Sequence, residues 1–78
     1  MSTSVVQHAQ ALARAVRFDA HRMHIVLLDG REISVPLEWC PTLRASSPRQ
    51  RSHWRLIGQG VGIHWPGLDE DISIDALL

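Results

Sequence analysis

Reactive side chains are most closely spaced near the end of the chain, where His64 is followed by the acidic run Asp69, Glu70 and Asp71. A histidine beside carboxylates could form an acid/base pair or a metal site. The sequence contains neither His-x-His nor His-x-x-x-His, the spacings that bring two imidazoles onto one ion. We therefore expect a turn whose carboxylates accept backbone hydrogen bonds and pair with arginines, and we predict no catalytic residue, metal or cofactor. A small enzyme or metal site around His64 and Asp69–Asp71 is the second alternative.

Cys40 is the only cysteine, so an internal disulfide is impossible and a reducing, cytoplasmic location is expected. Its thiol could act as a nucleophile with His53 or His64 as base, but no cysteine-protease or redox motif surrounds it. A lone cysteine between Trp39 and Pro41 is more often a small buried hydrophobe. We expect Cys40 to be buried.

Positive charge is concentrated in residues 41–60, which contain four arginines and no acidic residue. These arginines, with the histidine and tryptophan among them, are Arg44, Arg49, Arg51, His53, Trp54 and Arg55. Guanidinium groups could bind phosphates while the tryptophan stacks on a base, so a nucleic-acid-binding module using Arg49–Arg55 is the first alternative. However, the net charge is zero, and residues 61–78 contain four acidic and no basic residues. Pairing of the two stretches within the fold or across a homodimer is the simpler expectation.

The hydrophobic pattern predicts an α+β fold with a small antiparallel sheet and one main helix. Runs of β-strand character occur at Ala15–Phe18, Met23–Leu28, Arg31–Val35, Gly60–Trp65 and Ile72–Ile74. The main helix is expected over Pro48–Ile57, because Ser47 and Gln50 form a capping-box pattern around a proline and Gly58 follows as a C-terminal cap. A second helix is expected near Val5–Arg14.

Asp29-Gly30 is the strongest local signal, because this dipeptide between two strand-like runs favours a two-residue type I′ turn. It predicts a β-hairpin over Met23–Val35 in which Leu28 lies opposite Arg31. The alternating side chains that this register would turn toward the core are Val26, Leu28, Ile33 and Val35.

A chain of 78 residues has room for one small core, so we expect a single domain over residues 15–78 after an N-terminal extension over residues 1–14. Trp39, Trp54 and Trp65 are expected to anchor the core or an interface, and one left exposed would mark a binding patch. No apolar run is long enough to cross a bilayer and no signal peptide is evident, so no membrane partner is predicted.

The chain resembles a bacterial family known as domain of unknown function 2442 in three segments, Leu27–Trp39, Ser47–Pro66 and Leu68–Ile74. The resemblance as a whole extends over Phe18–Leu78. The resemblance implies a small α+β fold with an antiparallel sheet and a helix, and it carries no established catalytic residues. Relatives are often encoded beside another small uncharacterised protein, in an arrangement similar to a toxin–antitoxin pair. Some relatives carry a C-terminal helix-turn-helix. The sequence up to Leu78 contains no such helix-turn-helix, so direct transcriptional regulation is not expected.

These observations predict a small non-enzymatic protein that binds another protein, as one half of a toxin–antitoxin-like or regulatory pair. This prediction rests on the three tryptophans, which are many large aromatic anchors for so short a chain, and on the lack of a sequence motif for catalysis. The expected interaction surface consists of Arg49, Arg51, Trp54, Arg55, His64, Trp65, Asp69, Glu70 and Asp71.

Overall fold

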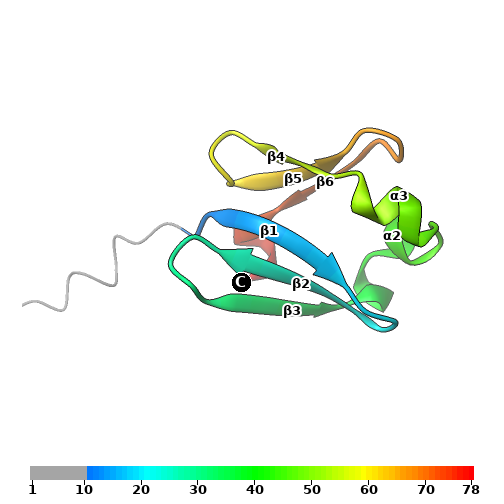
Figure 1. The fold of residues 1–78 in the computed structure, drawn as a ribbon, viewed down its shortest axis with the longest axis horizontal. Coiled ribbons are helices and arrows are strands. Elements are labelled where there is room, and N and C mark those ends of the chain that lie inside the picture. Colours follow the sequence, from blue (N-terminus) through cyan, green and yellow to red (C-terminus); the bar gives the residue numbers. More distant parts are fainter. Residues whose placement is uncertain (1–10) are drawn as a thin grey trace, which may run out of the picture.

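The computed structural model describes residues 11–78, which form two three-stranded antiparallel sheets and four short helical segments (Figure 1). The strand orders are β1-β2-β3 and β4-β5-β6. In chain order, the elements are β1 (Ala13–Phe18), β2 (Arg22–Leu27), β3 (Glu32–Pro36), the 3₁₀ helix η1 (Leu37–Trp39), α2 (Pro41–Arg44), α3 (Pro48–Ser52), β4 (Arg55–Ile57), β5 (Gly62–Trp65), β6 (Glu70–Ser73) and α4 (Ile74–Leu77). The predicted α+β fold with antiparallel strands is confirmed, although the strands form two sheets rather than one.

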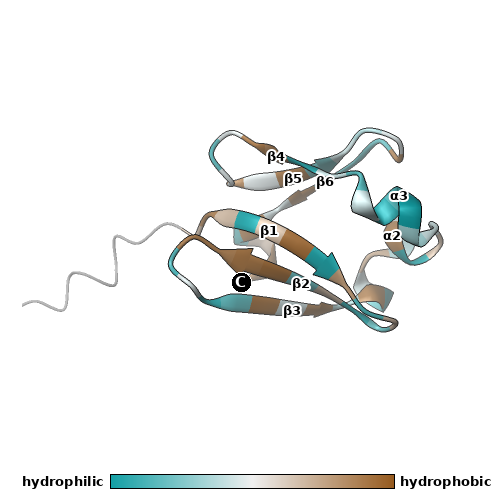
Figure 2. Cartoon of the chain, in the orientation of Figure 1, coloured by the Kyte–Doolittle hydropathy of each residue, from teal (hydrophilic) through white to brown (hydrophobic). Residues whose placement is uncertain are grey.

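One hydrophobic core is shared by the two sheets and the short helices η1, α2 and α4. Its largest fully buried side chains are Trp65, Met23, Ile25, Leu27, Leu43, Ile63, Ile74 and Val35. Figure 2 shows β2 as largely hydrophobic and α3 as hydrophilic, which agrees with the central place of β2 in its sheet. The core is therefore built on the strands, and α3 lies at the surface.

The β2–β3 hairpin forms as predicted, but its register differs by one residue. Ile25 lies opposite Ile33. Leu27 accepts the N–H of Gly30 at 3.0 Å and donates its own N–H to Arg31 at 2.8 Å. The loop thus has three residues rather than two, and Gly30 occupies its left-handed position with φ 95°. This is the three-residue hairpin loop with a glycine bulge, the next most common solution after the two-residue turn.

The one-residue difference turns the opposite face of β2 toward the core, because side chains alternate along a strand. Met23, Ile25 and Leu27 are buried, whereas Leu28 is 58% exposed. The prediction that Val26 and Leu28 belong to the core face was wrong. Burial of three large side chains favours the observed register over the predicted one.

The predicted helix over Pro48–Ile57 was wrong beyond its first turns. The capping box is present, since the Ser47 hydroxyl accepts the N–H of Gln50 at 3.1 Å and the Gln50 side chain accepts the N–H of Ser47 at 2.9 Å. The helix α3 nevertheless ends at Ser52, and Arg55–Ile57 forms strand β4. A lone short helix is marginal in water, while strand pairing with β5 satisfies the backbone and buries apolar surface.

The two sheets are in backbone contact where Ala13 at the start of β1 meets Gly60 in the β4–β5 turn. The Ala13 N–H donates to the Gly60 carbonyl at 2.8 Å. Gly60 has φ +107°, and an added Cβ would lie 2.3 Å from the Ala13 carbonyl oxygen. Only glycine combines this backbone conformation with this approach.

The N-terminal prediction can be compared with the structure only at its end. Strand β1 begins at Ala13 rather than Ala15, so the last two residues of the predicted helix Val5–Arg14 are extended. The remainder of that helix lies almost entirely outside the described residues. Within residues 11–78, no helix has the length and apolar character that a membrane span requires.

Candidate functional site

In the sequence, His64 is close to three acidic residues, and in the structure its side chain contacts one of them, Asp71. His64 on β5 lies opposite Asp71 on β6, and its Nδ1 is hydrogen-bonded to the Asp71 carboxylate. Arg55 on β4 lies opposite His64 on its other side. The three side chains thus form a row across the second sheet, beside a shallow hollow of about 370 Å³ that Leu56 and Ile57 also line.

The other two carboxylates lie apart from this row. Glu70 pairs with Trp65, one position away from Asp71, so it projects from the opposite face of β6. Asp69 lies in the β5–β6 turn with φ 51°. Within residues 11–78, no group of three or more histidine, cysteine, aspartate or glutamate side chains is placed to hold a metal ion. The arrangement around His64 is a two-residue hydrogen-bonded pair with a neighbouring arginine.

The predicted burial of Cys40 is confirmed, because the residue is only 7% exposed. Burial raises the pKa of its thiol, and the charge of Glu70 adds a smaller increase. The uncharged thiol is therefore favoured, whereas a nucleophilic cysteine needs the thiolate.

The arginines of residues 41–60 do not share one helix. Arg49 is exposed on α3 and Arg55 is exposed on β4, while Arg51 is half-buried. Arg51 donates from Nε to the Leu43 carbonyl at 2.8 Å and from Nη2 to the Arg44 carbonyl at 3.0 Å. Arg51 thus binds the carbonyl end of α2, where the Leu43 carbonyl also accepts the N–H and the hydroxyl of Ser46.

The predicted ion pairs between residues 41–60 and 61–78 within one chain are wrong for the structure. Both stretches lie in its described part, and no ion pair joins them there. The arginine pairs present are Arg17 with Glu32 and Arg31 with Asp29. Pairing across a homodimer stays a prediction.

The three tryptophans have different surroundings. Trp65 is fully buried, so its predicted place on an interaction surface is wrong. Its ring packs edge-to-face on Phe18 at 6.4 Å, and its Nε1–H donates to the Arg51 carbonyl at 3.0 Å. Trp54 is half-buried against the core, and Trp39 on η1 is 69% exposed. One tryptophan holds the core and two reach the surface.

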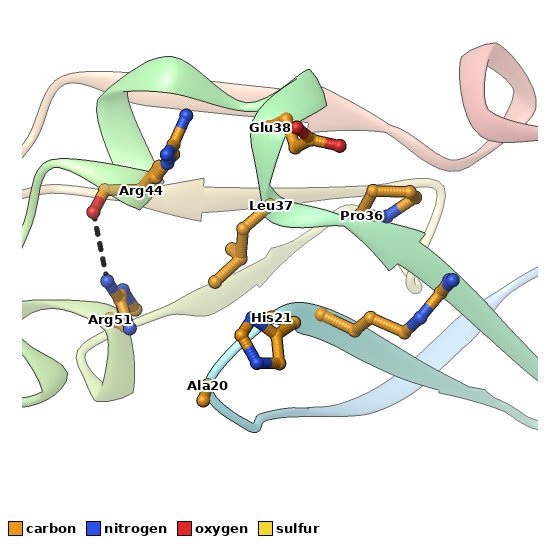
Figure 3. Close-up of a pocket in the computed structure, with 8 residues that line it drawn as sticks. Ala20, His21, Pro36, Leu37, Glu38, Arg44 and Arg51 are labelled. Atoms are coloured by element: carbon orange, nitrogen blue, oxygen red, sulfur yellow. Dashed lines mark hydrogen bonds between the residues drawn. The ribbon is translucent and has the colours of Figure 1, made fainter.

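Two neighbouring hollows flank Arg51, and we call them the apolar hollow and the cationic hollow. The apolar hollow, of about 480 Å³, is lined by Val16, Arg17, Phe18, Asp19, Ala20, Pro48, Arg51, Ser52 and Trp54. The cationic hollow, of about 530 Å³, is lined by Ala20, His21, Arg22, Pro36, Leu37, Glu38, Arg44 and Arg51 (Figure 3). Because the lining residues come from distant segments, sequence reasoning found only Arg51, Arg44 and Trp54 among them.

Sequence reasoning also missed a hydrogen-bonded chain of Asp19, His24 and Ser34. His24 Nε2 lies 2.7 Å from the Asp19 carboxylate, and its Nδ1 lies 2.8 Å from the Ser34 hydroxyl. The correct register places His24 opposite Ser34, whereas the predicted one placed it opposite Val35. The three residue types are those of a serine hydrolase. Neither His24 nor Ser34 lines any of the hollows described above.

The Asp19 carboxylate instead organises the β1–β2 turn. It accepts the backbone N–H groups of His21 and Arg22, each at 2.8 Å. The hydrogen bond from His24, followed by these two backbone bonds, holds the pKa of Asp19 well below its usual range. We interpret the chain of three side chains as a structural link that fixes this turn, which borders both hollows.

Comparison with known proteins agrees with the fold. A crystal structure of a protein of unknown function from Rhodospirillum rubrum ATCC 11170 is similar, with a TM-score of 0.76 and 30% sequence identity over 88% of this chain and 86% of that one. No curated protein matches the chain. The family model described as "Protein of unknown function (DUF2442)" matches residues 13–78. The chain therefore belongs to the DUF2442 family.

Proposed function

We propose that this chain is a non-enzymatic protein that acts by binding another protein, with the apolar hollow as the centre of the interface. The observation that carries the proposal is this hollow of about 480 Å³, which a half-buried tryptophan and a fixed arginine both line. Protein interfaces place their binding energy in such pockets, and tryptophan and arginine are enriched there.

The composition of the hollow supports an apolar anchor from the partner. Val16, Phe18, Pro48 and Trp54 supply apolar surface, and the charged groups of Arg17 and Asp19 belong to exposed residues. An apolar centre with a polar rim is the usual anatomy of a protein interface. One leucine- or phenylalanine-sized side chain of the partner would fit, with its neighbours contacting the rim.

The arginine arrangement favours a protein over a nucleic acid as the partner. Arg51 is half-buried, and the exposed Arg49 and Arg55 lie on different elements. A nucleic-acid surface needs several guanidinium groups that follow the phosphate backbone together. The zero net charge of the chain points in the same direction.

The partner we propose is the small protein encoded beside such family members, as in a toxin–antitoxin-like pair. The test is co-expression of the chain with the product of the adjacent gene, followed by co-purification and titration calorimetry. Trp54→Ala should weaken binding at least about tenfold, because hot-spot tryptophans contribute about 2 kcal/mol or more. Leu28→Ala is the matched control, since Leu28 is an exposed apolar residue that does not line the hollow.

Because Trp54 contacts the core, its loss could also unfold the chain. Ser52→Trp adds bulk at the hollow instead of removing it and should weaken binding without loss of the thermal transition. Weakened binding by Trp39→Ala alone would place the interface on η1 and contradict the proposal. A complex that forms only with nucleic acid, and dissociates steeply with salt, would also contradict it.

A further inference from the structure

We propose that the cationic hollow is a binding site for a small molecule that carries a phosphate monoester. Four parts of the chain meet around it: the β1–β2 turn with the start of β2, the end of β3 with η1, α2 and α3. Figure 3 shows Leu37 between Arg44 and Glu38 on one side and His21 and Arg51 on the other. The hollow thus brings together charges that are far apart in the sequence.

The charges of the hollow are unbalanced. Its lining residues include three arginines, Arg22, Arg44 and Arg51, but a single acidic residue, Glu38. In the part of the chain that the structure describes, none of these arginines forms an ion pair with a carboxylate. The three arginines and Glu38 together leave an excess of two positive charges. A phosphate monoester carries about −1.5 to −2 at neutral pH and so matches this excess better than a carboxylate does.

The position of Arg51 favours binding because its side chain is held before a ligand arrives. Its guanidinium donates to the Leu43 and Arg44 carbonyls and lies 6.0 Å from the centre of the Phe18 ring. These bonds use two of its five N–H groups, and the others stay available for an oxyanion. A fixed arginine loses little conformational entropy on binding, and its planar fork fits two phosphate oxygens.

The walls of the hollow are also fixed to each other. The Leu37 N–H donates to the His21 carbonyl at 2.9 Å, which joins η1 to the β1–β2 turn. The Asp19 carboxylate binds the N–H groups of His21 and Arg22 and holds the same turn from its other side. The site is therefore formed without a ligand, as small-molecule sites usually are.

The size of the hollow indicates a phosphorylated molecule rather than the free ion. Its volume of about 530 Å³ is within the range of roughly 300–1,000 Å³ that is typical of small-molecule sites. The half-buried Pro36 adds apolar surface for the remainder of the ligand. The site shares only Ala20 and Arg51 with the apolar hollow, so this proposal and the protein-binding proposal can fail independently.

The test is a calorimetric titration at constant ionic strength with phenyl phosphate, inorganic phosphate and benzoate, followed by amide chemical shifts. Phenyl phosphate should bind at one site, more tightly than inorganic phosphate and at least about tenfold more tightly than benzoate. Arg22→Gln and Arg44→Gln should each weaken phenyl phosphate about tenfold, as expected for the loss of one charge-assisted contact. Both side chains belong to exposed residues, so the fold should persist.

Arg49→Gln is the matched control, because it removes the same charge from an exposed residue outside the hollow and should leave binding unchanged. An equal loss with Arg49→Gln, equal affinity for benzoate, or no saturation would overturn the proposal. Ser52→Trp, which alters the apolar hollow at a residue that does not line the cationic hollow, should bind phenyl phosphate normally even where partner binding is lost. Loss of both phenyl phosphate binding and partner binding in this variant would show that the two sites are not separate.

Discussion

Replacement of Gly60 by alanine should destabilise the protein, because Gly60 is where the two sheets touch through their backbones. An alanine Cβ would lie 2.3 Å from the carbonyl oxygen and 2.8 Å from the nitrogen of Ala13. Since these are backbone atoms, no side chain can rotate to relieve the clash. The chain would have to move β1 away from the β4–β5 turn and lose the hydrogen bond from Ala13 to Gly60.

The magnitude follows from two contributions. An L-residue forced into a left-handed conformation costs about 1–2 kcal/mol, and an inter-sheet hydrogen bond broken in a buried position costs about 1–3 kcal/mol. The expected loss is therefore roughly 2–5 kcal/mol, out of a total stability of roughly 4–12 kcal/mol for a domain of this size. The midpoint of thermal unfolding should fall by at least about 8 °C.

Two other glycines separate these contributions. Gly30 has a positive φ, but no atom lies within 4 Å of an added Cβ, so Gly30→Ala measures the conformational penalty alone. At Gly67 the backbone is not left-handed and the space is also open, so Gly67→Ala should change stability by less than about 1 kcal/mol. The expected order of destabilisation is Gly60→Ala, then Gly30→Ala, then Gly67→Ala.

The assay is urea unfolding of the three variants, with hydrogen exchange of the Ala13 amide as a local probe. That amide should lose protection in Gly60→Ala and retain it in Gly30→Ala. If Gly60→Ala proves no more destabilising than Gly30→Ala, or if the Ala13 amide stays protected, the close approach of the two sheets is refuted.

Three further outcomes are expected. The pKa of Asp19 is held below its usual 3.8, chiefly by the His24 hydrogen bond. The ionised Asp19 carboxylate therefore contributes to stability above pH 3.8, and this contribution is lost as the pH falls through and below that value. The midpoint of urea unfolding should consequently decrease less between pH 5 and pH 2 in Asp19→Asn than in the parent protein. Trp65→Phe should lower stability by about 1–3 kcal/mol because it shrinks a fully buried side chain and removes the hydrogen bond to the part-buried Arg51 carbonyl, whereas Trp39→Phe should have an effect below about 0.5 kcal/mol. Cys40 should react with a thiol reagent at least about tenfold more slowly in the folded than in the urea-unfolded protein, and equal rates would contradict its burial.

Several features were set by neighbouring residues and could be predicted from the sequence. The hairpin around Asp29-Gly30, the capping box of Ser47 and Gln50, and the burial of Cys40 all agree with the structure. Each depends on interactions within a few residues, or on the hydrophobic character of one side chain. The α+β class followed in the same way, because strand periodicity and helix caps are local patterns.

Other features were decided by contacts between distant segments. A two-residue and a three-residue loop at Gly30 differ little in local free energy. The loop length nevertheless determines whether Ile25 or Val26 faces the core. The three-residue loop is favoured because it buries the larger side chains. Residues 55–57 became a strand because β5 was there to pair with Leu56.

The candidate sites belong to this second group. The link between His24 and Ser34 depends on the observed register. The cationic hollow forms where the β1–β2 turn, η1, α2 and α3 meet, and the apolar hollow forms where β1 and the β1–β2 turn meet α3. From the sequence, Arg51 was one arginine of a basic segment. The tertiary structure fixed its direction, because only the folded chain places the carbonyl ends of α2 and the ring of Phe18 around its guanidinium.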